Sequence, residues 1–219
     1  MQFAHFLMRY ILEAKKIFDI LGEMFPQAKA ELDYCNPFEL LIATVLSAQT
    51  TDIKVNQVTK KLFQSYPTPF DLSQANNTDV EEIIKTIGLY RTKAKNIITL
   101  SQILVERFAG EVPTSMENML ILPGVGRKTA SVVLSEAYGI PAIAVDTHVL
   151  RTTNRLGLST SDNPLVVEEQ LKQQFAPQDW HMLHHRLIFF GRYFCKASPK
   201  DCDRCPFRSF CTYIAKQNA

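Results

Sequence analysis

One stretch constrains the fold more than any other part of the 219-residue chain. Residues 120–130 read Leu-Ile-Leu-Pro-Gly-Val-Gly-Arg-Lys-Thr-Ala. Pro123 and Gly124 are residues that end a helix, and Gly126 is expected to close a tight turn. A second apolar helix is expected over residues 127–138, ended by Gly139. The stretch therefore predicts two helices joined by a short hairpin.

The hairpin is also a candidate binding site. Two glycines let the backbone come close to a bulky ligand, and the first N–H groups of the second helix point to the same place. Backbone donors at the positive end of a helix bind anions, and phosphate is the obvious one. Lys128 lies in this first turn beside Arg127, so it should lose its proton readily and act as a nucleophile. A plain glycine turn with two solvated cations is the alternative, because short glycine motifs arise by chance.

Apolar periodicity and capping residues predict helices along the rest of the chain and no strand long enough to build a sheet. The first is an amphipathic helix at the N-terminus, with Phe6, Tyr10, Ile17 and Leu21 on one face. The others are expected over residues 38–48, 55–66, 78–87, 90–109, 114–122, 127–138, 147–156, 164–175 and 179–194. Pro67 and Pro69 are expected to stop the helix over residues 55–66. The expected first residues or caps are Asn36, Thr78 with Glu81, Thr114 with Glu117, Asp146, Asn163 and Asp179. The fold class is therefore all-α.

Charge is distributed unevenly although the net charge is only +2. Residues 83–105 hold four basic residues and no acidic one, so the folded chain could present a basic face, although ordinary scatter explains the pattern equally well. Gly88 with Lys93 repeats the spacing around Gly124 and Lys128 approximately, which predicts two basic turns facing one ligand.

No apolar run reaches the ~18 residues of a membrane span, and the N-terminus lacks the features of a signal peptide. We expect a cytoplasmic protein.

Four of the five cysteines crowd into the C-terminal region, at Cys195, Cys202, Cys205 and Cys211. Four thiols in one short loop predict a metal site, and the spacing alone leaves zinc and an iron–sulfur cluster open. Pro206 directly after a cysteine favours the cluster. Lys196 and Lys200, between the first two ligands, are expected to reach a phosphate backbone. Cys35 stands alone and is expected to be buried.

These segments together resemble the endonuclease III family of DNA glycosylases. The resemblance rests on residues 122–130, on residues 144–149 (Ala-Val-Asp-Thr-His-Val) and on the four-cysteine spacing. Residues 46–52 (Leu-Ser-Ala-Gln-Thr-Thr-Asp) and 87–90 (Ile-Gly-Leu-Tyr) match the family too. The likeness runs from about residue 36 to residue 211, which is most of the chain.

The resemblance implies a bifunctional enzyme of DNA base-excision repair. It would remove oxidised pyrimidines from double-stranded DNA and cleave the resulting abasic (AP) site by β-elimination. Lys128 would attack the anomeric carbon of the sugar and form a Schiff base. Asp146 would stabilise the positive charge that develops on the sugar. Asp146 is also expected to be a helix N-cap.

The resemblance further implies two helical domains with a DNA-binding cleft between them. A six-helix barrel with the hairpin would span residues 30–140, and residues 1–29 with 141–219 would form a domain around a 4Fe-4S cluster held by the four cysteines. The residues expected to contact DNA are Gln49, Leu89, Gly124, Val125, Gly126, Arg127, Thr129, Lys196 and Lys200. Gln49 and Leu89 would fill the gap that an extruded base leaves. For Leu89 the alternative is a buried residue at a helix end.

Two other functions fit part of the pattern. A monofunctional adenine glycosylase would lack a lysine at the position of Lys128 and would carry a glutamate near Thr44. A non-catalytic binder of damaged DNA would need neither Lys128 nor Asp146. We expect a monomer, and we expect His184 and His185 to serve packing or to support the cluster ligands. No residue at the spacing of a metal site surrounds His148.

Overall fold

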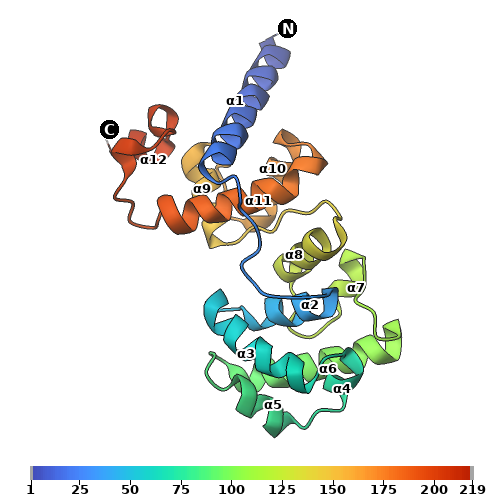
Figure 1. Cartoon of the computed structure of the whole chain (residues 1–219). Helices are drawn as coiled ribbons and strands as arrows, with labels where there is room; N and C mark the ends of the chain where they lie inside the picture. The colour runs from blue at the N-terminus through green and yellow to red at the C-terminus, as the bar shows by residue number, and fades with distance from the viewer. Residues whose placement is uncertain (1, 218–219) are drawn as a thin grey trace. The chain divides into compact units, whose positions relative to one another are not determined.

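The structure is a computed structural model that describes the backbone of residues 2–217 and the side chains of residues 13–215. Throughout these residues the fold is helical and contains no strand, as predicted (Figure 1). The α-helices are α1 (Gln2–Met24), α2 (Pro37–Leu46), α3 (Asp52–Ser65), α4 (Pro69–Ser73), α5 (Asn77–Ile84), α6 (Tyr90–Phe108), α7 (Met116–Leu120), α8 (Arg127–Tyr138), α9 (Thr147–Leu156), α10 (Pro164–Gln174), α11 (Trp180–Phe189) and α12 (Thr212–Gln217). No helix in the described part of the chain is long and apolar enough to cross a membrane.

The chain forms two compact units. The central unit is Glu31–Ile140, and the terminal unit joins Met1–Ala30 to Pro141–Ala219. Each unit has its own core of buried apolar side chains, as expected where a helix must bury one face against others.

Helix α2 is the centre of the central unit. Leu40, Leu41, Ile42 and Leu46 are fully buried, so nearly every face of α2 is covered. Its neighbours are α3, α6 and α8, and Figure 1 shows α8 beside it. Because α8 follows the hairpin directly, the core of this unit fixes the position of the hairpin.

In the terminal unit, helix α1 packs against α10 and α11, so segments from both ends of the chain build one core. Ile17 and Leu21 of α1 are buried there, as their spacing predicts. Phe6 and Tyr10, expected on the same face, lie outside the residues whose side chains are described. After α11 the chain continues as one π-helical turn, Phe190–Phe194, which leads to Cys195.

Three predicted N-caps are confirmed. Asn36, Asp146 and Asn163 each accept hydrogen bonds from backbone N–H groups of the helix that follows. Helix α11 begins after Asp179, but this carboxylate makes no capping hydrogen bond to it.

Two predicted capping boxes are wrong. Helix α5 is capped by Asn76, whose side chain accepts from the Thr78 N–H. Helix α7 is capped by Ser115, whose hydroxyl accepts from the Asn118 N–H. In both cases another capping residue stands within two positions of the expected one, and its side chain is the one that reaches the free N–H groups.

Helix α3 ends at Ser65, before the two prolines expected to stop it, Pro67 and Pro69. Pro69 also opens an additional helix, α4, with Thr68 and Asp71 as a capping box. The expectation that Cys35 is buried is wrong, because Cys35 is exposed.

Candidate functional site

The hairpin between α7 and α8 is held tightly by the core of the central unit. Gly124 has a φ of +79°, which favours glycine. A Cβ added there would lie 3.1 Å from Asn96 Nδ2 and 3.1 Å from Val45 Cγ1. Gly124 therefore allows both the turn and its close approach to α2 and α6.

Gly126 has a different role from the expected tight turn. Its φ of −94° and ψ of 176° are extended, and it is the N-cap of α8 without a side-chain hydrogen bond. A Cβ added at Gly126 would meet nothing within 4 Å. The missing side chain therefore leaves an open approach to the first N–H groups of α8, as an anion site requires.

The neighbouring residues differ in what they can offer a ligand. Arg127 and Lys128 are exposed in the first turn of α8, and Thr129 is half-buried. The Val125 side chain is buried, so Val125 can face a ligand only with its backbone. The hairpin thus combines backbone donors with two exposed cations.

Asp146 belongs to the terminal unit and is the N-cap of α9. Its Oδ1 accepts from the N–H groups of His148 and Val149, each at 2.9 Å. The expected capping role is confirmed. Lys128 belongs to the central unit, so the two predicted catalytic residues come from different units.

Gln49 and Leu89 share an unusual backbone conformation. Their φ angles are +54° and +57°, in the left-handed region that residues other than glycine rarely adopt. Both side chains are exposed, and Leu89 has 62% of its surface accessible. The alternative that Leu89 is a buried helix-end residue is wrong. Sequence reasoning did not anticipate the strained backbone.

Lys93 does not form the second basic turn that the repeated pattern predicts. It is only 5% exposed, so it cannot face a ligand beside Lys128. Burial also lowers the pKa of its amine, because the charged form is less stable away from water.

The four C-terminal cysteines line one cavity of the terminal unit. All four are partly buried, and Phe190, Phe194 and Phe207 line the same cavity. Burial raises the pKa of the Cys205 thiol, and nearby Cys195, Cys211 and Cys202 add to this. Soft thiol donors converging in an apolar surrounding fit a metal ion or an iron–sulfur cluster.

Arg155 contacts both the cysteine cavity and the loop that carries the lysines predicted to bind DNA. Its Nη1 lies 3.3 Å from Cys195 Sγ and donates to the Lys196 carbonyl at 2.7 Å, and its Nη2 donates to the Ala197 carbonyl at 2.9 Å. The guanidinium also lies over the Tyr213 ring, 4.1 Å from its centroid.

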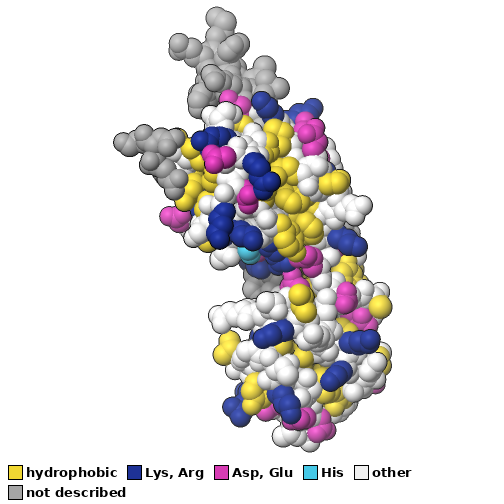
Figure 2. Space-filling model, turned by 60° about the vertical axis from the view of Figure 1, so that its left-hand side comes forward, with side chains coloured by type: hydrophobic (Ala, Val, Ile, Leu, Met, Phe, Trp, Pro, Cys, Tyr) yellow, Lys and Arg dark blue, Asp and Glu magenta, His cyan; other side chains and the backbone are white. Residues whose placement is uncertain are grey.

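The lysines on this loop are open to a ligand. Lys196 and Lys200 are exposed. Figure 2 shows a group of Lys and Arg side chains close together on the terminal unit. The loop therefore carries two exposed lysines on a backbone that Arg155 holds by hydrogen bonds.

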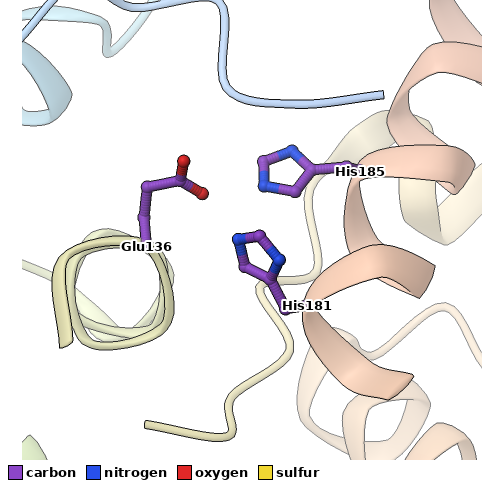
Figure 3. A group of neighbouring side chains, drawn as sticks. All are labelled: Glu136, His181 and His185. Atoms are coloured by element: carbon purple, nitrogen blue, oxygen red, sulfur yellow. The ribbon is translucent and has the colours of Figure 1, made fainter. Parts of the chain in front are cut away.

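Several histidines lie close together on helix α11. His184 and His185 are buried in α11, with ring centroids 5.1 Å apart. Figure 3 shows His181 one turn before His185 on the same helix, and their rings are 4.7 Å apart. Figure 3 also shows Glu136, on α8 of the central unit, whose carboxylate accepts from the Tyr34 hydroxyl at 3.0 Å.

Comparisons with known proteins show which family the chain belongs to. Residues 42–177 match the family model described as "HhH-GPD superfamily base excision DNA repair protein". Endonuclease III of Bacillus subtilis (strain 168) is 53% identical over 194 residues, which cover 88% of this chain and 89% of that protein. Endonuclease III of Escherichia coli (strain K12) is 45% identical and covers 90% of this chain and 93% of its own length.

A solved structure titled "Structure of a Trapped Endonuclease III-DNA Covalent Intermediate: Estranged-Adenine Complex" superposes with a TM-score of 0.91. It is 48% identical in sequence, and the match covers 95% of this chain and 99% of the other. The fold and the hairpin thus define a base excision DNA repair protein of the helix-hairpin-helix class. Within that class, the chain belongs to the endonuclease III family.

Proposed function

We propose that this DNA glycosylase and AP lyase removes oxidised pyrimidines from double-stranded DNA, with Lys128 as the nucleophile. One observation carries the proposal. The exposed lysine Lys128 lies in the first turn of α8, whose N-cap Gly126 makes no side-chain hydrogen bond and leaves the first N–H groups open to a ligand. Such a turn binds a phosphate, and the phosphate brings the adjoining deoxyribose to the amine.

The chemistry needs one amine and one carboxylate. The Lys128 amine attacks C1′ of the sugar, the bond from C1′ to the base breaks, and the base leaves with its electron pair. Asp146 stabilises the positive charge on the sugar and accepts the proton that the amine loses. The sugar ring opens to a Schiff base, a proton leaves C2′, and the bond from C3′ to oxygen breaks with departure of the phosphate. Two successive bond cleavages thus use the same lysine.

Extrusion of the base leaves a gap in the duplex. Gln49 and Leu89 fill it, because both are exposed on the central unit and both project from backbone in the left-handed conformation. The backbone of Gly124 and Val125, the first N–H groups of α8, and the side chains of Arg127 and Thr129 bind the phosphates near the lesion. Lys196 and Lys200 bind phosphates from the terminal unit.

The four cysteines hold a 4Fe-4S cluster in this proposal. The support is the convergence of four thiols on one cavity, with aromatic side chains around them and the Arg155 guanidinium beside Cys195. A bound cluster would cross-link the loop from Cys195 to Cys211 and so hold Lys196 and Lys200 in place. The central unit would be the six-helix barrel, the terminal unit the cluster domain, and the chain would act in the cytoplasm as a monomer.

A set of duplexes tests this proposal. Each duplex carries one defined lesion: an oxidised pyrimidine, an AP site, or an adenine opposite an oxidised guanine. We expect base removal and strand cleavage on the first and strand cleavage on the second. Removal of adenine without strand cleavage would instead identify a monofunctional adenine glycosylase. Tight binding without any cleavage would identify a non-catalytic binder of damaged DNA.

A further inference from the structure

Lys93 is a buried cation whose amine contacts both sides of Gln49. Its Nζ donates to the Leu46 carbonyl at 2.9 Å, to the Ala48 carbonyl at 2.7 Å and to the Thr50 hydroxyl at 2.9 Å. An ammonium group has three N–H donors, so these three acceptors use its whole hydrogen-bonding capacity. Two of these bonds therefore go to the residues directly before and after Gln49, which are Ala48 and Thr50.

The position of this amine explains how a buried charge is tolerated. Leu46 is the last residue of α2, and the carbonyls at the C-terminal end of a helix carry partial negative charge and have no partner within the helix. The Lys93 amine satisfies carbonyls at this end, just where the backbone turns into the left-handed conformation of Gln49. Charge and hydrogen bonding both hold residues 46–50 in this shape.

The same lysine is bonded to the second strained segment. The Lys93 backbone N–H donates to the Leu89 carbonyl at 3.0 Å, which forms the first turn of α6. The two segments also adjoin directly, since a Cβ added at Gly88 would lie 4.0 Å from the Gln49 carbonyl oxygen. One residue therefore connects the segment that carries Gln49 to the segment that carries Leu89.

We propose that Lys93 is a positioning residue that holds Gln49 and Leu89 as one pre-shaped pair for insertion into the duplex. The proposal rests on the proposed function, which assigns these two side chains to the gap left by an extruded base. Glutamine and leucine leave the left-handed conformation readily when nothing holds them. Without the Lys93 side chain, residues 46–50 relax, and the ordering of Gln49 must then take place during binding.

The test compares Lys93→Met with Lys95→Met. Methionine keeps an unbranched side chain and removes the donors, and Lys95 is an exposed lysine on the same helix, so its substitution removes the same charge without touching the loop. We expect Lys93→Met, which loses all three hydrogen bonds of the amine, to slow base removal from a damaged duplex roughly tenfold or more. Cleavage of an AP site in single-stranded DNA should change by less than about twofold, because a single strand has no gap to fill, and Lys95→Met should match the wild type on the duplex.

A double-mutant cycle separates positioning from general destabilisation. If Lys93 acts through Gln49, then adding Lys93→Met to Gln49→Ala should slow duplex cleavage little beyond Gln49→Ala alone. Additive losses would overturn the inference, and so would equal losses on single-stranded and duplex DNA.

If Lys93→Met does not fold, Thr50→Val and Thr50→Ser decide the question. Valine removes one acceptor of the amine and serine keeps it, so only Thr50→Val should slow duplex cleavage. Equal rates for these two variants would overturn the inference.

The controls distinguish this inference from the proposed function. An inactive wild-type protein would refute the proposed function. A wild-type rate in Gln49→Ala would refute the assignment of Gln49 to the gap, and with it the role of Lys93. A slow Gln49→Ala variant beside a fully active Lys93→Met variant would refute the role of Lys93 alone.

Discussion

Asp146 caps helix α9 and, in the proposed mechanism, stabilises the positive charge on the sugar. The substitution Asp146→Asn separates these two roles. The structure shows a single oxygen, Oδ1, accepting both capping hydrogen bonds, from His148 and Val149 at 2.9 Å each. Asparagine offers the same carbonyl oxygen and caps helices about as well as aspartate. The interaction of the negative charge with the helix dipole is lost, which costs about 0.3–1 kcal/mol, and so is its attraction to the nearby Arg151 guanidinium.

Asp146→Ala provides the matched comparison, because alanine removes both capping bonds. That change should lower the free energy of unfolding by about 1–2 kcal/mol. For a protein of this size, such a loss lowers the melting temperature by roughly 2–8 °C. The melting temperature of Asp146→Asn should stay closer to that of the wild type.

In Asp146→Asn the rate of base removal should change far more than the melting temperature does. If the charge of Asp146 stabilises the transition state, single-turnover base removal by Asp146→Asn should fall by about 100-fold or more. Thermal unfolding followed by circular dichroism and single-turnover kinetics on a damaged duplex measure the two effects. A stable Asp146→Asn variant with the wild-type rate would show that Asp146 is only a helix cap and would refute this reasoning.

Three further predictions concern the terminal unit. The purified protein should be yellow-brown with broad absorbance near ~400 nm, as for a cluster held by four thiolates; a colourless protein with stoichiometric zinc after anaerobic purification would contradict the cluster. Lys196→Ala and Lys200→Ala should each reduce the slope of log K against log salt for duplex binding by ~1, whereas an unchanged slope would place the loop away from DNA. Arg155→Lys should lower the free energy of unfolding by about 1–3 kcal/mol, since a point charge cannot replace a guanidinium that serves several acceptors at once; an unchanged melting temperature would show that these contacts contribute little.

Local signals predicted much of the helical fold, because capping is decided within a few residues. Asn36 and Asp146 were identified as caps for this reason. The same logic failed where two capping residues are neighbours, as at Ser115. There the choice depends on which side chain reaches the free N–H groups, and the residue type does not decide it.

The candidate site was predictable where its geometry is local and unpredictable where tertiary contacts set it. Lys93 and Lys128 follow similar glycine turns, yet Lys128 is exposed and Lys93 is buried. The difference comes from the end of α2, whose carbonyls meet the Lys93 amine and are far from it in sequence. The left-handed backbone of Gln49 could not be predicted from the local sequence for the same reason, because the Lys93 side chain that holds it is distant in sequence.

Trapping with borohydride tests the central claim, that Lys128 is the nucleophile. Borohydride added during turnover reduces a Schiff base, so wild-type protein should become covalently linked to a duplex that carries an AP site. Lys128→Gln should give neither the adduct nor strand cleavage, while it still binds the duplex through the hairpin N–H groups and Arg127. An adduct formed by Lys128→Gln at the wild-type rate would show that another amine is the nucleophile and would contradict the account.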